Sequence, residues 1–251
     1  MSDLTRDAKT GSAAVKIERM LRLLAKGELA VEGRLPWSSN DSFVLSLRDK
    51  DLACLAVYKP RRGERPLWDF PDGTLYLREY AAFVVSQALG WQLVPPTVLR
   101  EGPYGKGSVQ LYVDADPESH FFSLRDKYPA EFRRVALFDA LVNNADRKSG
   151  HCLCDRTDHI WCIDHGLTFN AEPKLRTVIW DYAGEPIPER LLDDLRAFEA
   201  QLERPAEVRK ILKDLLSPQE IRMLCARLDE LLKAGCFPQP RGGRHVPWPL
   251  I

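Results

Sequence analysis

The sequence has no excess of charge and no long apolar run. Its 251 residues carry 36 Lys plus Arg against 36 Asp plus Glu, so the formal net charge is zero. Nucleic-acid-binding domains are usually basic, and the balance therefore predicts no nucleic-acid partner. No apolar stretch approaches the roughly 20 residues that cross a bilayer, and the polar start of the chain lacks the apolar core of a secretion signal. We therefore expect a cytoplasmic chain with no integral membrane association.

Cysteine motifs are missing as well. Six cysteines at irregular spacing are too few for a disulfide scaffold, and no CxxC pair marks a zinc site. Histidine and cysteine nevertheless gather within fifteen residues, at His151, Cys152, Cys154, His159, Cys162 and His165. This density leaves two explanations open: a structural zinc site, or cysteines that serve as small buried side chains in strands.

Local patterns divide the chain into two parts. Apolar spacing and turn formers predict helices and strands in the first part, with helices over 14–26 and 74–90 and strands over 28–35, 42–48, 52–59, 97–100 and 107–113. Thr74 and Gly90 are the expected caps of the second helix. The second part is mainly helical, with helices over 130–144, 189–202, 206–216 and 218–234 and short strands over 152–155 and 159–164.

This order indicates an α+β fold with two lobes. The expected segments are an N-terminal tail and helix over 1–27, a lobe built on an antiparallel sheet with one helix over 28–113, a mainly helical lobe over 114–236 and an irregular tail over 237–251. Ligands usually bind in the cleft that such lobes form.

Four side chains have the types and the order that phosphoryl transfer requires. Lys59 ends the third strand, Glu79 lies in the next helix, Asp146 follows a helix, and Asp164 ends a strand. A strand lysine can bind phosphates, a strand-end aspartate can hold magnesium, and a loop aspartate can orient the acceptor hydroxyl. Each residue alone has an ordinary explanation as a surface charge or a turn residue. The prediction therefore depends on their combination.

Several stretches together resemble the phosphatidylinositol 3/4-kinase superfamily. They read ADRKSGH, IDHGLTF, YKPRRGERPLWDFPDGTLYLREYAA and KLRTVIWDYAGEPIP. More closely, they are similar to a small bacterial kinase-like family. The resemblance implies a two-lobed, protein-kinase-like fold that uses ATP and Mg²⁺ to phosphorylate a hydroxyl group. The implied acceptor is a small molecule, a lipid head group or a protein.

The resemblance also implies roles for individual residues. Lys59 would bind the ATP phosphates and Glu79 would pair with it. Asp146 would be the catalytic-loop aspartate, Asp164 would be the principal magnesium ligand, and Lys148 is placed to reach the γ-phosphate. The segment Gln110–Val113, which includes Tyr112, would form the hinge that holds adenine.

Two positions depart from the superfamily's pattern. His151 stands where a metal-binding asparagine is usual, and magnesium prefers oxygen donors. This leaves open a single metal ion, a preference for Mn²⁺ or a weak enzyme. No GxGxxG precedes Lys59, so Ser38, Ser39 and Asn40 of the turn GRLPWSSNDSF are the expected phosphate-capping residues.

Two other functions remain open from the sequence. One is a nucleotide-binding pseudokinase that acts as an interaction module, which the histidine at 151 motivates. The other is a nucleotidyl transferase on the same scaffold. The aromatic residues Trp180 and Tyr182, with Asp181 between them, either line an acceptor pocket or pack the terminal helices.

Overall fold

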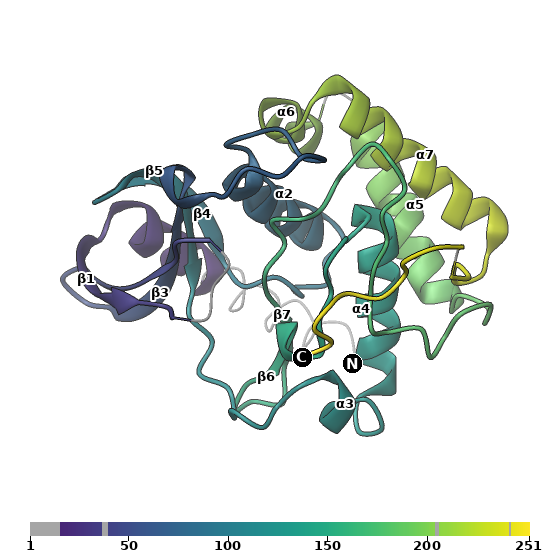
Figure 1. Ribbon diagram of the computed structural model, residues 1–251, viewed down its shortest axis with the longest axis horizontal. Helices are drawn as coiled ribbons and strands as arrows, with labels where there is room; N and C mark the ends of the chain where they lie inside the picture. Colours follow the sequence, from purple (N-terminus) through teal and green to yellow (C-terminus); the bar gives the residue numbers. More distant parts are fainter. Residues whose placement is uncertain (1–15, 37–39, 204–205, 241) are drawn as a thin grey trace, which may run out of the picture. The chain divides into compact units, whose positions relative to one another are not determined.

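The computed structural model describes residues 16–36, 40–203, 206–240 and 242–251, and its contacts divide the chain into two compact units. Unit 1 comprises Met1–Leu67 and Pro96–Tyr112, and unit 2 comprises Trp68–Pro95 and Val113–Ile251. Unit 1 is built on an antiparallel sheet and unit 2 is mainly helical (Figure 1). The expected α+β class, with the sheet before the helices, is confirmed.

Unit 1 is a five-stranded sheet with a helix packed on one face. The strands run in the order β1-β2-β3-β5-β4, with bounds β1 (Glu28–Arg34), β2 (Phe43–Arg48), β3 (Ala53–Pro60), β4 (Thr97–Gly102) and β5 (Gly105–Leu111). The helical residues 16–26 supply Leu23 and Leu24 to a buried core that includes Ala56 and Tyr58 of β3. Because side chains alternate along a strand, Lys59 projects from the opposite face of the sheet.

Unit 2 holds the remaining helices and one small hairpin. The elements are α2 (Leu75–Ala88), α3 (Phe121–Leu124), α4 (Pro129–Val142), the 3₁₀ turn η2 (Ser149–His151), β6 (Cys152–Cys154), β7 (Ile160–Cys162), α5 (Glu189–Glu203), α6 (Glu207–Leu215) and α7 (Pro218–Ala234). Helices α4 and α5 both pack against α7. Their core side chains are apolar and buried, among them Phe132, Phe138, Leu195, Phe198, Leu224 and Leu228.

Local sequence explains where the long helices begin and end. Ser217 and Glu220 form a capping box at the start of α7, and Gly235 ends it in the left-handed conformation, with φ +60°. Helix α4 begins with Pro129 at its first turn and ends at Asn143, which is also left-handed, with φ +53°. The end of α4 thus turns the chain sharply into the segment that carries Asp146.

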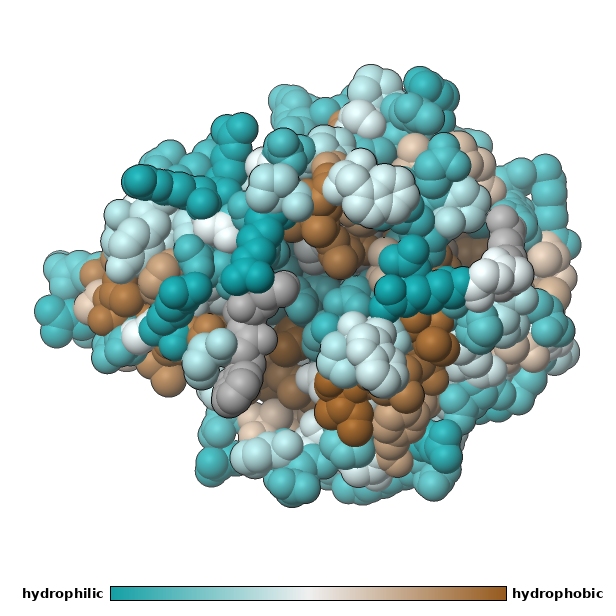
Figure 2. All heavy atoms as spheres, in the orientation of Figure 1, coloured by the Kyte–Doolittle hydropathy of each residue, from teal (hydrophilic) through white to brown (hydrophobic). Residues whose placement is uncertain are grey.

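The described residues after α7, 235–240 and 242–251, form no helix or strand, and they are hydrogen-bonded to the rest of unit 2. The N–H of Ser149 donates to Leu250 O over 2.8 Å, and the N–H of Thr177 donates to His245 O over 3.1 Å. Hydrophobic side chains gather where the tail ends (Figure 2), and Trp248 and Ile251 there are 77% and 65% exposed. No helix in the described parts of the chain is long and apolar enough to cross a membrane.

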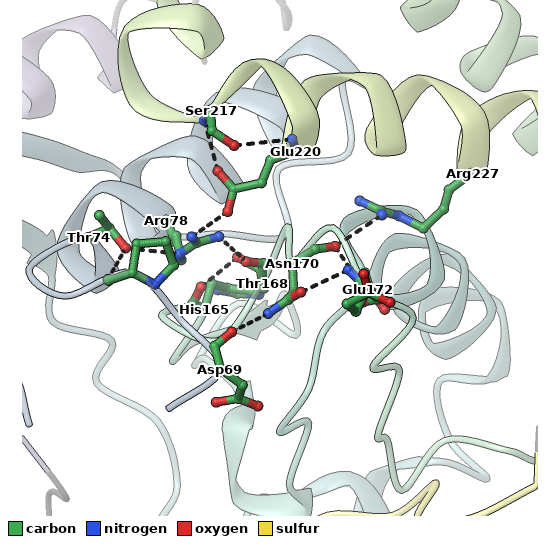
Figure 3. Close-up of polar contacts among 12 residues, drawn as sticks. Asp69, Thr74, Arg78, His165, Thr168, Asn170, Glu172, Ser217, Glu220 and Arg227 are labelled. Atoms are coloured by element: carbon green, nitrogen blue, oxygen red, sulfur yellow. Dashed lines mark hydrogen bonds and ion pairs between the residues drawn. The ribbon is translucent and has the colours of Figure 1, made fainter. Parts of the chain in front are cut away.

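The helix α2 differs from the expectation in two respects. The sequence placed it in the sheet lobe over 28–113, whereas its contacts assign it to unit 2. The reason is a buried network in which Arg78 pairs with Glu220 of α7 and donates to Thr168 O over 2.7 Å (Figure 3). Thr74 occupies the N-cap position as predicted, but its hydroxyl donates to Pro71 O and caps no N–H of the helix.

Candidate active site

Two loops of unit 2 carry the predicted catalytic and metal-binding residues, and backbone hydrogen bonds hold them side by side. We call residues 143–151 the catalytic loop and residues 163–169 the metal loop. The N–H of Ala145 donates to Leu167 O over 2.8 Å, and the N–H of Ile163 donates to His151 O over 3.0 Å. The loops are therefore joined at two places, and side chains from each can act on one ligand.

A buried arginine reinforces this junction. The guanidinium of Arg147 binds the Asp139 carboxylate of α4 with two contacts of 2.9 Å, and both side chains are fully buried. Arg147 also donates to Ile163 O over 3.0 Å, and its Nη2 lies 2.7 Å from His165 Nε2. Because the guanidinium is a donor, this ring nitrogen accepts and the imidazole is neutral. The alternative that Arg147 is a surface charge is wrong.

Four polar side chains lie on the two joined loops. Lys148 Nζ is 3.2 Å from Asp146 Oδ2, and these side chains are 22% and 25% exposed. His151 Nε2 is 3.4 Å from Asp164 Oδ2. Asp164 has φ +62°, a conformation that non-glycine residues seldom adopt and that is frequent at functional sites. The structure therefore brings Asp146, Lys148, His151 and Asp164 onto one pair of joined loops, and their roles stay predictions.

The carboxyl group of Asp146 has an unusual electrostatic environment. Burial raises its pKa above the ordinary value, while the ammonium of Lys148 opposes the rise. The negative charge of Asp164 raises the pKa of Asp146 further, and the positive charge of Arg244 lowers it. A half-buried carboxylate with a raised pKa accepts a proton more readily than an exposed one does.

The site offers one carboxylate oxygen and one imidazole nitrogen as candidate metal ligands. Magnesium usually takes only one or two protein ligands, and phosphate and water complete its shell. Asp164 Oδ2 and His151 Nε2 are close enough to serve one ion. Structural zinc needs four protein ligands. In the described ranges no group of three or more His, Cys, Asp and Glu side chains is placed to hold a metal, so the zinc alternative finds no site there.

Two of the predicted nucleotide-binding residues fall in different units. Lys59 lies on β3 of unit 1, opposite Ser108 of β5. Glu79 lies on α2 of unit 2 and is almost fully buried, and its carboxylate accepts the N–H of His165 over 3.0 Å. Glu79 therefore holds the metal loop through its backbone, a role the sequence did not predict. Its pairing with Lys59 stays a prediction.

The other predicted nucleotide contacts lie mostly in unit 1. Ser38 and Ser39 are outside the described residues. Asn40 accepts the N–H of Arg65 through its side-chain oxygen over 2.9 Å, so that oxygen holds a neighbouring loop. In the expected hinge, Gln110 donates to the Thr97 hydroxyl over 2.9 Å, and the chain passes from unit 1 to unit 2 between Tyr112 and Val113.

The residues that sequence reasoning missed are buried charges. Asp139 is the single acid in the apolar run VALFDALV, and an acid in such a run signals a buried cationic partner. Arg78 gave no comparable signal, because its partner Glu220 is 142 positions away in the chain. These two ion pairs hold the elements that present the catalytic and metal loops.

The chain is similar to several known proteins. No family model matches the chain. Phosphatidylinositol 4-kinase gamma 4 of Oryza sativa subsp. japonica is 29% identical over 170 residues, which cover 59% of this chain and 30% of the rice protein. A crystal structure of the Helicobacter pylori proinflammatory kinase CtkA superimposes with a TM-score of 0.49 at 16% identity, over 85% of this chain and 94% of that one.

A bacterial relative is similar over nearly its whole length. Protein Rv2133c of Mycobacterium tuberculosis is 40% identical over 267 aligned residues, which cover 91% of this chain and 94% of the relative. Identity and coverage of this extent mean that the two proteins share a fold and a common origin along almost the entire chain. The chain belongs to the family of Protein Rv2133c.

Proposed function

We propose that the protein is a phosphotransferase that moves the γ-phosphate of ATP to a hydroxyl group, with Mg²⁺ or Mn²⁺ as its metal. The observation that carries the proposal is the junction of the catalytic and metal loops, on which Asp146, Lys148, His151 and Asp164 lie together. The similarity to a protein named as a phosphatidylinositol 4-kinase supports it.

The proposed reaction uses Asp146 and Lys148 on the acceptor side. Asp146 accepts or orients the hydroxyl proton, for which its raised pKa suits it. The ammonium of Lys148 lies next to this carboxylate and stabilises negative charge on the transferring phosphoryl group. Arg147 makes no contact with substrate in this scheme. It binds Asp139 and thereby fixes the catalytic loop, which holds the side chains of Asp146 and Lys148 in position.

In this proposal Asp164 and His151 are the metal ligands. Their donor atoms, 3.4 Å apart, would hold one divalent ion, and the bound ion would neutralise charge on the phosphates. A nitrogen donor at 151 favours Mn²⁺ over Mg²⁺ relative to an oxygen donor. Lys59 of unit 1 is proposed to bind the phosphates, and Gln110–Val113 to hold the adenine.

The test is γ-labelled ATP turnover, with water and a panel of alcohols as acceptors. We expect Asp164→Ala and Asp146→Asn to lower turnover by about 100-fold or more, because each removes a group that acts in the transition state. Asp193→Asn, an exposed acid on α5, is the matched control and should change nothing. Label that moves only from the α position would instead support a nucleotidyl transferase.

The assignment of Asp164 and His151 as metal ligands is tested by comparing turnover rates with Mg²⁺ and with Mn²⁺. His151→Asn replaces the nitrogen donor with an oxygen donor, so the ratio of the Mg²⁺ rate to the Mn²⁺ rate should rise. Asp164→Ala should weaken binding of Mg-ATP. Equal Mg-ATP affinity of the wild type and Asp164→Ala would show that Asp164 is not the metal ligand.

A further inference from the structure

A cavity in unit 2 has none of the four polar residues described above in its lining. Its volume is about 340 Å³, which falls in the range of small-molecule sites. The walls come from the end of α4, one face of α7, residues 171–180, and residues 236–239 and 242–245 of the tail. Apolar side chains such as Trp180, Leu231 and Phe237 form part of the lining.

The charged groups around this cavity are mostly positive. Arg176, Arg227 and Arg244 line it together with Lys174, whereas Glu230 is the one acid among the lining residues. Lys174 is already paired with Asp69 at 3.1 Å. Arg227 donates to two backbone carbonyls, Leu141 O over 2.9 Å and Asn170 O over 3.4 Å. The arginine charge in the cavity therefore exceeds the acidic charge that faces it.

Two of these guanidinium groups hold buried donors that nothing in the described residues satisfies. They are Nε of Arg176 and Nη2 of Arg227. Figure 3 shows Arg227 extending from α7 toward the loop that carries Asn170. Buried polar groups in proteins are nearly always hydrogen-bonded, so these donors are open to a water molecule, an ion or a ligand. Burial also lowers the pKa of Arg227 to about 10, although the charges of Glu220 and Glu230 oppose the change.

The cavity is tied to the catalytic loop by the backbone. The carbonyl of Arg176 accepts the N–H of Arg147 over 3.0 Å, and the N–H of Arg176 donates to Asn144 O over 2.9 Å. The same tail that contributes Arg244 to the cavity contacts the catalytic loop through Leu250. An occupant of the cavity would thus contact segments that position the catalytic loop.

We propose that this cavity binds a small organic anion, either a phosphate monoester or a carboxylate with an apolar part, through the guanidinium groups of Arg176, Arg227 and Arg244. The anionic oxygens accept from these guanidinium groups, and the apolar part packs on Trp180 and Phe237. Arginine suits this task because its planar fork matches both carboxylate and phosphate oxygens. The inference stands on these contacts and does not require the chain to be a kinase.

The experiment is calorimetric and thermal-shift titration of the full chain with phenyl phosphate, benzoate and phenol. We expect the two anions to bind and to raise the melting temperature, and the neutral phenol to do neither. Excess Mg-ATP should leave anion binding intact, because none of Lys59, Asp146, His151 and Asp164 lines the cavity. Displacement by ATP, or equal binding of phenol, would overturn the proposal. A preference between the phosphate and the carboxylate identifies the anion class.

Variants test the assignment of residues. Arg176→Gln and Arg244→Gln should each weaken anion binding about tenfold or more, because each removes a charge-assisted hydrogen bond. Arg244 is exposed, so its replacement does not endanger folding. Arg222→Gln, an exposed arginine on the same α7, is the matched control and should bind as the wild type does. Unchanged affinity in both cavity variants would overturn the proposal, whatever the outcome of the turnover assay.

Discussion

The Asp146 carboxylate is the residue on which the proposed chemistry depends most directly. It is half-buried on a loop, with the ammonium of Lys148 at 3.2 Å and the charge of Asp164 nearby. Burial and Asp164 push its pKa up, and Lys148 and Arg244 push it down, with a net rise. The neighbours of one side chain thus set the pH range in which it can act as a base.

The first prediction concerns the pH profile of turnover. The base must be ionised, so the rate should fall as pH drops through the raised pKa of Asp146, above the value of about 3.9 for an ordinary aspartate. Lys148→Gln removes a group that lowers this pKa and should move the acid limb to higher pH, whereas Lys148→Arg should leave it in place. The measurement is the turnover rate as a function of pH for the wild type, Lys148→Gln and Lys148→Arg. An acid limb that does not move in Lys148→Gln would contradict the role of Asp146 as the base.

The same shift has a consequence for stability. A carboxyl group whose pKa is higher in the folded state favours folding below its unfolded pKa, and this contribution is lost as pH rises through the folded pKa. At neutral pH the ionised Asp146 therefore disfavours folding slightly. Residues at functional sites often lower the folding stability of the protein.

At the scale of elements, the sequence predicted the helices and strands well where apolar periodicity was long. The five strands of unit 1 and the helices α4, α5, α6 and α7 lie within a few residues of their expected bounds. Helix α3 was missed because it has only four residues, fewer than a periodic pattern needs. The hydroxyl of Thr74 turned to Pro71 O because a threonine can serve either a helix N–H or a nearby carbonyl.

How the elements attach to one another depends on buried polar contacts between distant segments. Arg78 of α2 and Glu220 of α7 form an ion pair with side chains 1% and 9% exposed. Glu220 also accepts the N–H of Ser217 over 2.8 Å, so one carboxylate both caps α7 and holds α2 (Figure 3). The ring of Phe70 packs under the guanidinium, 5.0 Å away.

The second prediction follows from this pair. Arg78→Met leaves the Glu220 carboxylate buried without its cation, and the free energy of unfolding should fall by about 3–5 kcal/mol. Arg78→Met combined with Glu220→Gln removes both charges and should recover a substantial part of that loss. Chemical denaturation of the single and double variants measures the coupling. Additive losses in the double variant would mean that the two side chains do not depend on each other.

At the scale of the whole molecule, the C-terminal tail makes hydrogen bonds to the catalytic loop that the sequence did not predict. Its composition predicts irregular structure, and this is what it has. Yet its carbonyls accept the N–H groups of Ser149 and Thr177, and His245 O also accepts the indole N–H of Trp180 over 3.0 Å. Irregular backbone can support a site when its hydrogen bonds go to that site.

The third prediction is that deletion of residues 244–251 will loosen the catalytic loop. The amides of Ser149 and Thr177 lose their acceptors, so their hydrogen exchange should speed up by at least about tenfold. The amide of Ala145, whose acceptor is Leu167 O, and the amides of the β1–β2 ladder are internal controls. Unchanged exchange at Ser149 and Thr177 would show that the tail does not support the loop.

The sequence by itself determined the fold class, the positions of most elements and the set of polar residues on the two loops, because periodicity, caps and short motifs are local. Only the tertiary structure decided that Arg147 is buried against Asp139, that α2 belongs with the helices, and that three arginines line one cavity. Those facts concern residues that are distant along the chain, and the free energy of burying a charge is set by whichever partner the folded chain brings to it.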